Sequence, residues 1–269
     1  MALNAEALKL DFNRVEIEVK DFIRDAIQGS GSKGLIVGLS GGIDSSVTVT
    51  LCVKAVGPDK VLGLLMPDAG VTPQEDIEDA KSLASSLKIE TCTVPIDGIV
   101  ECFKESLPLK SVDRVTEGNV SARTRMVLCY FFANALNRLV VGTGDRSENL
   151  IGYFTKYGDG GVDLLPLGHL YKTQVRALAV HLGIPEKIIA KPSSPRLWPG
   201  HKATDEIPVD YDVLDIILHG LIDLGMNPGE VASDLDVSVG LVEEVLERFE
   251  TSKHKRDCPP MPNLLRIRP

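Results

Sequence analysis

The segment from Gly38 to Ser46, which reads G-L-S-G-G-I-D-S-S, carries the residue types needed to bind a phosphate group. Glycines let the backbone approach a ligand closely, and the free amide N–H groups at the start of a helix attract anions. Serine hydroxyls add hydrogen-bond donors. Asp44 would repel a phosphate unless a cation lay between them, and Mg²⁺ held by carboxylates and phosphates is the usual solution. This segment therefore predicts a site for a nucleotide and Mg²⁺.

The loop differs from the Walker P-loop, which requires a lysine that is absent from this segment. The string S-G-G-I-D-S from Ser40 to Ser45 instead resembles the signature of the pyrophosphatase-loop ATP enzymes. Those enzymes cleave ATP between its α- and β-phosphates. The plainer interpretation is a helix that begins after a glycine turn, with no ligand at all.

A second carboxylate, Glu148, follows another short apolar segment, Leu139 to Val141, and a glycine turn. Ligands of open α/β sheets bind outside the carboxyl ends of the strands. If the two strands are neighbours, Asp44 and Glu148 meet in one crevice and can share Mg²⁺, with Asp44 in contact with only solvent and metal. Thr143, in the same turn, can contact the nucleotide. Glu148 alone could equally be a solvated charge in the first turn of a helix.

The elements that must position these residues alternate along the chain. Strands are predicted at 35–39, 61–65, 90–94 and 139–141, and the continuous apolar residues of the first two indicate burial on both faces. Helices are predicted within 1–28 and at 44–55, 73–87, 117–137, 171–182, 210–224, 228–233 and 238–251. This order predicts an α/β fold with a doubly wound, mostly parallel sheet, helices on both faces and a helical C-terminal extension.

We expect a single domain over residues 1–269, made of the N-terminal helix, a nucleotide-binding core at about 34–190, and C-terminal helices with a tail at 208–269. Glycines and charges dominate from Gly152 to Gly168, and proline, serine and glycine are frequent at about 191–207. Both segments are predicted to be mobile loops.

The composition excludes several classes of function. A net charge of -9 disfavours nucleic acid as the main partner. The five cysteines include no C-x-x-C pair, which argues against a zinc or redox motif and suits a reducing compartment. The acidic N-terminus does not resemble a signal peptide, and no apolar segment approaches the roughly 18 residues needed to span a bilayer. We expect a cytoplasmic protein with no membrane partner.

Over nearly its whole length the chain resembles the ammonia-dependent NAD synthetases. Five segments stand in the order and rough spacing of that family: 40–45, 119–123, 142–148, 156–161 and 254–256. The strings K-Y-G-D-G-G, which begins at Lys156, and S-K-H-K-R, which begins at Ser252, point to this family rather than to the wider superfamily.

The resemblance implies an adenine nucleotide α-hydrolase-like fold, a homodimer, and a ligase that uses ATP and Mg²⁺ to amidate deamido-NAD with ammonia. NAD, AMP and pyrophosphate would form through an acyl-adenylate. It implies that ATP contacts Gly38, Leu39, Ser40, Gly41, Gly42, Ile43, Asp44, Ser45, Thr143, Lys172 and Ser194. It also implies that Asp44 and Glu148 hold Mg²⁺, that Arg123, Lys156, Asp163, His254 and Lys255 contact deamido-NAD, and that Asp44 and Lys172 act in catalysis.

One position departs from the family pattern. The family usually has threonine where Ser194 stands, and because Ser193 is adjacent, either serine could make the ATP contact. Asn119 and Arg123 are four residues apart and should share a helix face, where an arginine can grip a phosphate or carboxylate. Lys156 and Lys172 lie in or beside the glycine-rich loop, which suits charge neutralisation by a closing lid. Arg123, Lys156 and Lys172 could each instead be an ordinary solvated charge.

Other functions remain open on the sequence alone. A GMP-synthetase-type or tRNA-modifying ATPase would share the phosphate loop, but the first would lack K-Y-G-D-G-G and the second is disfavoured by the negative charge. A nucleotide sensor without turnover would have little need for both Asp44 and Glu148. Glutamine use normally requires an attached amidohydrolase domain with a catalytic cysteine. Because the synthetase-like fold is expected to occupy all 269 residues, we expect ammonia as the nitrogen donor, and a separate glutaminase partner stays open as its source.

Overall fold

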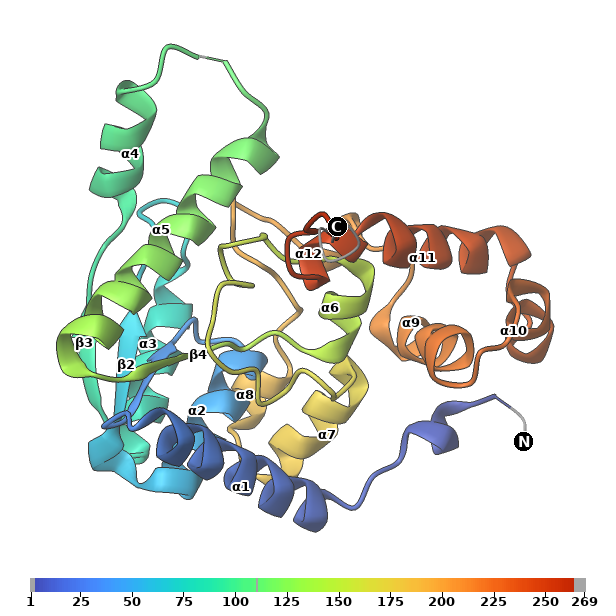
Figure 1. Ribbon diagram of the computed structural model, residues 1–269, viewed down its shortest axis with the longest axis horizontal. Coiled ribbons are helices and arrows are strands. Elements are labelled where there is room, and N and C mark those ends of the chain that lie inside the picture. Colours follow the sequence, from blue (N-terminus) through green and yellow to red (C-terminus); the bar gives the residue numbers. More distant parts are fainter. Residues whose placement is uncertain (1–2, 110, 264–269) are drawn as a thin grey trace, which may run out of the picture.

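The computed structural model describes residues 3–109 and 111–263, and its centre is a parallel sheet with the strand order β3-β2-β1-β4 (Figure 1). β1 (Leu35–Gly38) pairs with β2 (Val61–Leu65) on one side and with β4 (Leu139–Val141) on the other. β3 (Glu90–Thr93) lies beyond β2. The order reverses beside β1, so the β1–β4 boundary is the switch point at which such sheets bind ligands. The predicted fold class and all four predicted strands are confirmed.

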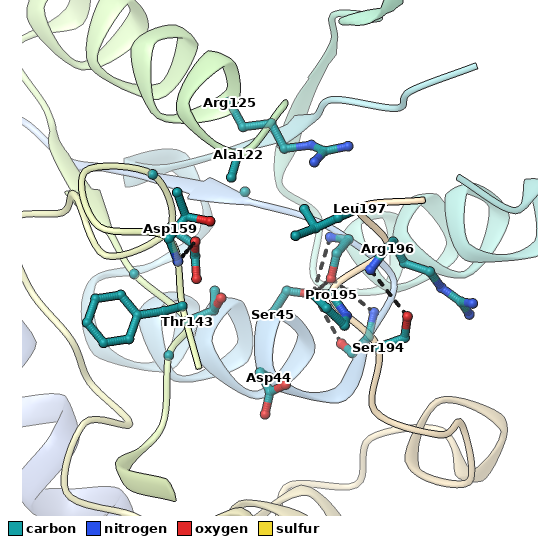
Figure 2. A pocket seen from close by; sticks show the side chains of 18 of the residues that line it. Asp44, Ser45, Ala122, Arg125, Thr143, Asp159, Ser194, Pro195, Arg196 and Leu197 are labelled. Atoms are coloured by element: carbon teal, nitrogen blue, oxygen red, sulfur yellow. Dashed lines mark hydrogen bonds between the residues drawn. The ribbon is translucent and has the colours of Figure 1, made fainter. Parts of the chain in front are cut away.

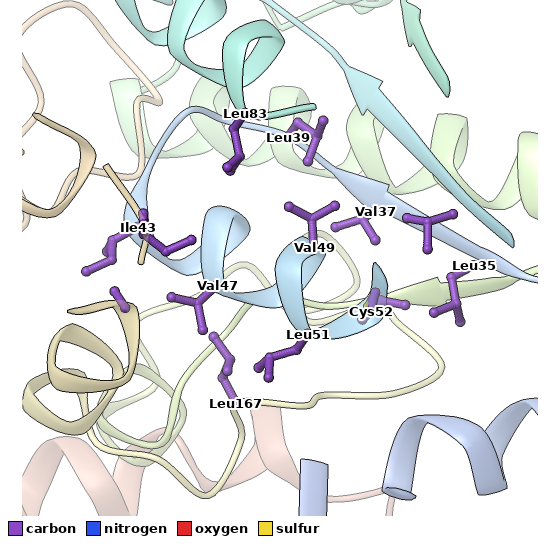
Figure 3. Packing of buried hydrophobic residues seen from close by; sticks show 14 of the residues in the cluster. Leu35, Val37, Leu39, Ile43, Val47, Val49, Leu51, Cys52, Leu83 and Leu167 are labelled. Carbon is purple, nitrogen blue, oxygen red and sulfur yellow. The ribbon is translucent and has the colours of Figure 1, made fainter. Parts of the chain in front are cut away.

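Alternate residues of the buried strands enter two different cores, because successive side chains of a strand point to opposite faces. Val37 of β1 belongs to one core together with Val49 of α2 (Ile43–Val56) and Leu83 of α3 (Gln74–Ser86), as Figure 3 shows. That core also includes residues of α1 (Phe12–Ser30) and α7 (Lys172–His181). Ile36, the neighbour of Val37, belongs to the core under α4 (Asp97–Glu105) and α5 (Arg114–Leu136). Helices therefore cover both faces.

Helices at the C-terminal end form a third core on the side of α6 (Arg146–Ile151), away from β3 (Figure 1). They are α9 (Tyr211–Leu218), the π-helix η4 (His219–Asp223), α10 (Pro228–Leu235) and α11 (Val239–Thr251). Leu150 and Ile151 of α6 contribute to this core, as do Leu3 and Leu8 from the N-terminal segment. The extension is thus packed directly against an element that carries predicted site residues.

Several short elements were missed from the sequence. α6, α8 (Glu186–Ile189) and α12 (Lys253–Arg256) are too short to display a helical period, whereas α4 was missed although Ile99, Val100 and Phe103 recur at helical spacing in it. The N-terminal helix begins later than predicted, because the Asp11 side chain accepts hydrogen bonds from the N–H groups of Asn13 and Arg14 and so caps it. Short 3₁₀ turns, η1 (Ala5–Leu8), η2 (Pro58–Lys60) and η3 (Ala203–Asp205), complete the fold. Within the described residues, no helix is both long and apolar enough to cross a membrane.

The glycine-rich segment after α6 returns to the sheet. Leu164 forms a parallel bridge with Val141, and the Gly142 N–H donates to the Leu164 carbonyl at 2.9 Å. This return places the far end of the segment beside β4, at the same sheet edge as the phosphate loop.

Glu16 should contribute pH-dependent stability, because it joins α1 to two other helices. Its carboxylate accepts from Lys20 at 2.9 Å and from Lys54 of α2 at 3.1 Å, and lies 3.4 Å from His181 of α7. The hydrogen bond from Lys20, aided by Lys54 and opposed by burial, lowers the pKa of Glu16 from 4.5 to about 2. A lowered folded-state pKa stabilises the fold above the unfolded value, and this contribution is lost as the pH falls toward 2.

Glu16→Gln should therefore lower the free energy of unfolding by about 1–2 kcal/mol at pH 7. Urea unfolding of both proteins between pH 7 and pH 3 measures the difference, which should shrink steadily below about pH 4.5. A difference that stays constant over this range would show that the charge of Glu16 is not the cause.

Candidate active site

A cavity of about 480 Å³ opens at the carboxyl ends of β1, β2 and β4. Its walls come from the phosphate loop, the turn after β4, the glycine-rich segment after α6, and the segment from Lys191 to Trp198. Figure 2 shows Asp44, Ser45 and Thr143 on one side of it and Asp159 and Arg125 on another. Of the residues predicted to bind ATP, the cavity is lined by Gly38, Leu39, Ser40, Gly42, Ile43, Asp44, Ser45, Thr143 and Ser194.

Serine hydroxyls hold the phosphate loop in shape. The Ser40 and Ser45 hydroxyl oxygens lie 3.0 Å apart, and the Gly42 N–H donates to the Ser40 hydroxyl at 3.3 Å. Gly41 has φ +78°, and a Cβ atom there would lie 2.1 Å from the Asp76 carbonyl oxygen. Both its backbone conformation and the close approach of α3 therefore require glycine at this position.

The N-terminus of α2 points its unpaired backbone donors toward the loop. Its N-cap residue is Gly42, which makes no side-chain cap hydrogen bond. The first amide N–H groups of the helix and the positive end of its dipole are thus available to an anion. This arrangement supports the predicted phosphate contact.

Three carboxylates surround one buried ammonium group. The Nζ atom of Lys172 lies 2.9 Å from Asp44, 2.7 Å from Asp145 and 2.9 Å from Glu148. Lys172 and Asp145 are fully buried, whereas the side chains of Asp44 and Glu148 are 25% and 21% exposed. We call Asp44, Asp145, Glu148 and Lys172 the carboxylate–lysine cluster.

The position of this cluster follows from the sheet order. α2 begins after β1, α6 begins after β4, and the pairing of these strands brings Asp44 and Glu148 together. Lys172 is the first residue of α7, which packs on α2. Residues more than 100 positions apart in the sequence thus meet at the switch point.

The charged groups of the cluster shift one another's pKa values. Burial, with repulsion from Asp145 and Asp44, raises the pKa of Glu148, and burial also raises the pKa of Asp145. Burial alone would lower the pKa of Lys172, but attraction to Asp145, Asp44 and Glu148 holds it well above its usual range. Lys172 therefore stays charged at neutral pH, and the surplus of carboxylates favours the arrival of further positive charge.

The cluster fits Mg²⁺ only together with a phosphate ligand. Within residues 3–109 and 111–263, no three His, Cys, Asp or Glu side chains are arranged to hold a metal ion by themselves. Mg²⁺ in nucleotide sites is usually held by one or two carboxylates plus phosphate oxygens and water. Asp44 and Glu148 supply two partly exposed carboxylates at the cavity wall, which matches this pattern.

One prediction about the cluster was wrong in detail: Asp44 was expected to contact only solvent and metal, but it also pairs with Lys172. The helix predicted to begin near Tyr171, after the glycine-rich loop, is confirmed, and Lys172 is its first residue. The alternative of an ordinary solvated lysine is wrong, because Lys172 is fully buried. Asp145 was missed, although its signal is visible: it stands three residues before Glu148 in a capping box.

The residues predicted to bind deamido-NAD form a connected group, with one exception. Both Nε and Nη2 of Arg123 donate to the Lys156 carbonyl at 3.3 Å. Lys156 donates to the His254 carbonyl at 2.5 Å. Lys255 lines the cavity and donates to the carbonyls of Gly152 and Phe154. These contacts join the K-Y-G-D-G-G and S-K-H-K-R strings in space.

Asp163 lies apart from that group. Its carboxylate accepts from the Val140 N–H at 2.7 Å and from the Tyr130 hydroxyl at 3.0 Å, and it thereby supports the edge of β4. Asn119 and Arg123 do share a face of α5, since Asn119 accepts a hydrogen bond from Thr155 in the segment that Arg123 also contacts. Asp159 accepts from the Thr155 N–H and shapes the turn, as its sequence context suggests.

Both candidate serines of the 191–207 segment line the cavity. The Ser194 hydroxyl donates to the His201 carbonyl and accepts from the Arg196 N–H, so it also shapes its own loop. Lys191 ties this segment to the phosphate loop: it pairs with Asp76 and Asp79 of α3 and donates to the Gly41 carbonyl at 3.3 Å.

Arg125 lines the cavity and is a further site residue that sequence reasoning missed. It lies two positions after Arg123 and therefore on a different face of α5, where its Nε donates to the Met66 carbonyl at the end of β2. Burial lowers its pKa, and the Asp68 and Asp159 charges oppose that effect. It places a positive charge in the wall of the cavity.

The chain matches the sequence model of the NAD synthase family over residues 15–259. It is 50% identical over 258 residues to the NH(3)-dependent NAD(+) synthetase of Hyperthermus butylicus, covering 96% of this chain and 93% of that relative. Among solved structures, NMN synthetase from Francisella tularensis superposes with a TM-score of 0.83 at 33% identity, covering 95% of this chain and 100% of that one.

NH3-dependent NAD synthetase from Campylobacter jejuni superposes with a TM-score of 0.80 at 30% identity, again covering 95% of this chain and 100% of that one. The family model covers most of the chain. Residues of the phosphate loop, the carboxylates Asp44 and Glu148, and part of each family string (Gly158, Asp159 and Gly161 from the first, Lys255 from the second) line one cavity. The resemblance found in the sequence is confirmed, and the chain belongs to the NAD synthase family.

Proposed function

We propose that this protein is an ATP-dependent ligase that amidates deamido-NAD with ammonia and releases NAD, AMP and pyrophosphate. The observation that carries the proposal is the meeting of Asp44 and Glu148 at the uncapped start of α2, in the wall of a cavity large enough for a nucleotide. The buried ammonium group of Lys172 lies directly behind these two carboxylates and pairs with both. The names of the relatives that are 41–50% identical support ammonia as the nitrogen donor and NAD as the product.

In the first step, a carboxylate oxygen of the nicotinate group attacks the α-phosphorus of ATP. The bond between the α-phosphorus and the bridging oxygen breaks, and pyrophosphate leaves with that electron pair. The N–H groups of the phosphate loop and the Lys172 ammonium stabilise charge on the phosphates. Asp44 and Glu148 would hold Mg²⁺, which neutralises phosphate charge when bound. The protein acts mainly by orienting two anions.

In the second step, neutral ammonia attacks the carbonyl carbon of the acyl-adenylate, and AMP leaves with the carboxylate oxygen. No protein nucleophile is required. The thiol that lines the cavity, Cys129, has its pKa raised to about 11 by burial and stays protonated at neutral pH. Closure of the two loops at the cavity, 152–168 and 191–207, would exclude water, which competes with ammonia for the acyl-adenylate.

The site residues keep the roles that the resemblance implies. We propose ATP contacts from Gly38 to Ser45, Thr143, Lys172 and Ser194, and deamido-NAD contacts from Arg123, Lys156, Asp163, His254 and Lys255. We also propose that the protein works in the cytoplasm as a single domain and as a homodimer. α5 offers a surface for the dimer: Val127 and Phe131 are 59% and 67% exposed and continue the row of Arg123.

A second candidate function is amidation of the mononucleotide, because a protein named NMN synthetase superposes closely on this chain. The two activities share the same chemistry and differ in the length of the substrate. Relatives of higher sequence identity carry the NAD synthetase name, which favours the dinucleotide.

The experiment that tests the function is a product assay with ATP, Mg²⁺ and ammonium. Parallel tubes contain deamido-NAD or nicotinate mononucleotide, and a further tube contains glutamine instead of ammonium. We expect NAD, AMP and pyrophosphate in equal amounts, with little product from glutamine. Faster amidation of the mononucleotide would support the second candidate, and no ATP turnover by the folded protein would contradict both.

Arg123→Ala should raise the KM for deamido-NAD by about 5- to 50-fold, the effect of losing one charge-assisted contact. The KM for ATP should change less than about twofold. Initial-rate kinetics with each substrate varied in turn measure both values. Arg248→Ala is the matched control, since Arg248 lies on α11, does not line the cavity and pairs with Glu244. Equal changes in both KM values would place Arg123 outside the deamido-NAD site.

A further inference from the structure

The C-terminal extension reaches the active site through a buried carboxylate, Asp215 of α9. Its side chain is fully buried and accepts from the Ser147 hydroxyl of α6 at 2.5 Å. It also accepts from the backbone N–H and the hydroxyl of Thr173 of α7, at 2.8 and 2.7 Å. The Ser147 hydroxyl in turn accepts from the Lys172 N–H at 2.9 Å. Asp215 therefore bridges the first turns of both helices.

The two residues held by Asp215 are the sequence neighbours of two cluster residues. Ser147 directly precedes Glu148, and Thr173 directly follows Lys172. Asp215 itself does not line the cavity, and both of its carboxylate oxygens already accept hydrogen bonds from α6 and α7. A buried carboxylate is expensive to desolvate, and apolar residues could join two helices at lower cost. This cost favours a role that needs directed hydrogen bonds.

A second carboxylate from the same segment repeats the pattern. Asp223 of η4 pairs with Arg146 of α6 and accepts from the hydroxyl of Tyr171, the N-cap residue of α7, at 2.8 Å. Arg146 is adjacent to Asp145, and Tyr171 is adjacent to Lys172. Two aspartates of the α9–η4 segment thus each hold one residue of α6 and one residue at the start of α7, and each of these four residues is the sequence neighbour of a cluster residue.

We propose that Asp215 is a positioning residue, which fixes Glu148 relative to Lys172 through Ser147 and Thr173, and that Asp223 supports it through Arg146 and Tyr171. This inference rests on the proposed function, in which both groups act on one nucleotide. Glu148 and Lys172 sit on different helices, and a displacement of about 1 Å can cost two orders of magnitude in rate. The C-terminal extension would then serve the geometry of the active site as well as the stability of the fold.

The test compares variants that change the hydrogen bonds without changing the shape. Thr173→Val removes the hydroxyl and keeps the volume, Thr173→Ser restores the hydroxyl, and Asp215→Asn removes the charge. Asp212→Asn is the matched control: it lies one turn earlier on α9, is 77% exposed, and pairs with Arg176 at 3.4 Å. Each variant is assayed for kcat, for both KM values, for melting temperature, and by calorimetry for binding of a non-hydrolysable ATP analogue in the presence of Mg²⁺.

We expect Asp215→Asn to lower kcat and to weaken binding of the analogue by about 10- to 100-fold, the range found for residues that orient metal ligands. Thr173→Val should lower kcat and weaken binding of the analogue by about tenfold, and Thr173→Ser should recover most of both losses. The KM for deamido-NAD and all properties of Asp212→Asn should stay near wild type.

Lower melting temperatures with wild-type kcat and analogue binding, measured well below each transition, would overturn the inference and leave Asp215 a purely structural residue. If Asp215→Asn does not fold, the Thr173→Val and Thr173→Ser pair decides. Binding of the analogue can be measured without turnover, so it tests the positioning role of Asp215 separately from the proposed amidation reaction. A wild-type protein that binds the analogue but makes no NAD would refute the proposed function alone.

Discussion

Asp44→Asn should lower kcat by about 100- to 1,000-fold, the loss typical when one electrostatic contact to a reacting group is removed. Asp44 is one of two partly exposed carboxylates at the cavity wall, and asparagine binds Mg²⁺ far more weakly than a carboxylate does. The fold should persist, because Lys172 keeps its ion pairs with Asp145 and Glu148. Steady-state kinetics and circular dichroism of the purified variant measure the two effects.

Asp97→Asn is the matched control for this variant. Asp97 also lies in the first turn of a helix, α4, but it is exposed and does not line the cavity. Its activity should equal that of wild type. A folded Asp44→Asn protein with near-normal activity would exclude Asp44 from metal binding and catalysis.

Lys172→Met should lower the free energy of unfolding by about 3–5 kcal/mol, the cost of leaving a buried charge without its partner. Asp145 is fully buried and would lose its ion pair with the only ammonium group in the cluster. Methionine fills a similar volume, so the loss measures charge rather than packing. Urea unfolding at pH 7 tests the prediction, and activity should disappear as well.

The pH dependence of Lys172→Met provides a second check. Glu148 and Asp145 already have raised pKa values in the wild type. A carboxyl group whose folded-state pKa is raised destabilises the fold as the pH rises from its unfolded toward its folded value. Without Lys172 this effect grows, so the deficit should shrink when unfolding is measured at lower pH, between about pH 8 and pH 5.

Lys253→Met is the control for the loss of a lysine. Lys253 is 68% exposed and pairs with Asp257 on the surface, so its removal should cost less than about 1 kcal/mol. A similarly small loss for Lys172→Met would mean that water or rearrangement satisfies Asp145, which would contradict its dependence on Lys172.

Much of the sheet could be predicted from the sequence because its strands are short apolar segments next to glycine turns. Leu35 to Val37 and Val61 to Leu65 are buried on both faces and show no alternation, which is the pattern of a covered parallel sheet. The phosphate loop could also be predicted from the sequence, because its glycines and serines occur in the fixed order of a known signature. The meeting of Asp44 and Glu148 followed from the assumption that their strands are neighbours, and the pairing of β1 with β4 confirms it.

Other features depend on tertiary contacts that no local pattern encodes. Lys172 resembles any charged residue at a helix start, and only the approach of α7 to α2 and α6 places it among three carboxylates. Asp215 is likewise an acidic residue within an apolar helix, and its partners lie 68 and 42 positions away. The roles of Arg123, Lys156 and His254 rest on family resemblance, because hydrogen bonds within the chain account for their present positions.

The most direct test of carboxylate adenylylation is the transfer of oxygen from substrate to AMP. Deamido-NAD labelled with ¹⁸O at both oxygens of the nicotinate carboxylate is converted in the presence of ATP, Mg²⁺ and ammonium, and the AMP is analysed by mass spectrometry. Because the attacking oxygen leaves with AMP when ammonia enters, we expect one ¹⁸O atom in each AMP phosphate and one in each amide. Formation of NAD with unlabelled AMP would contradict an acyl-adenylate and require another route of activation.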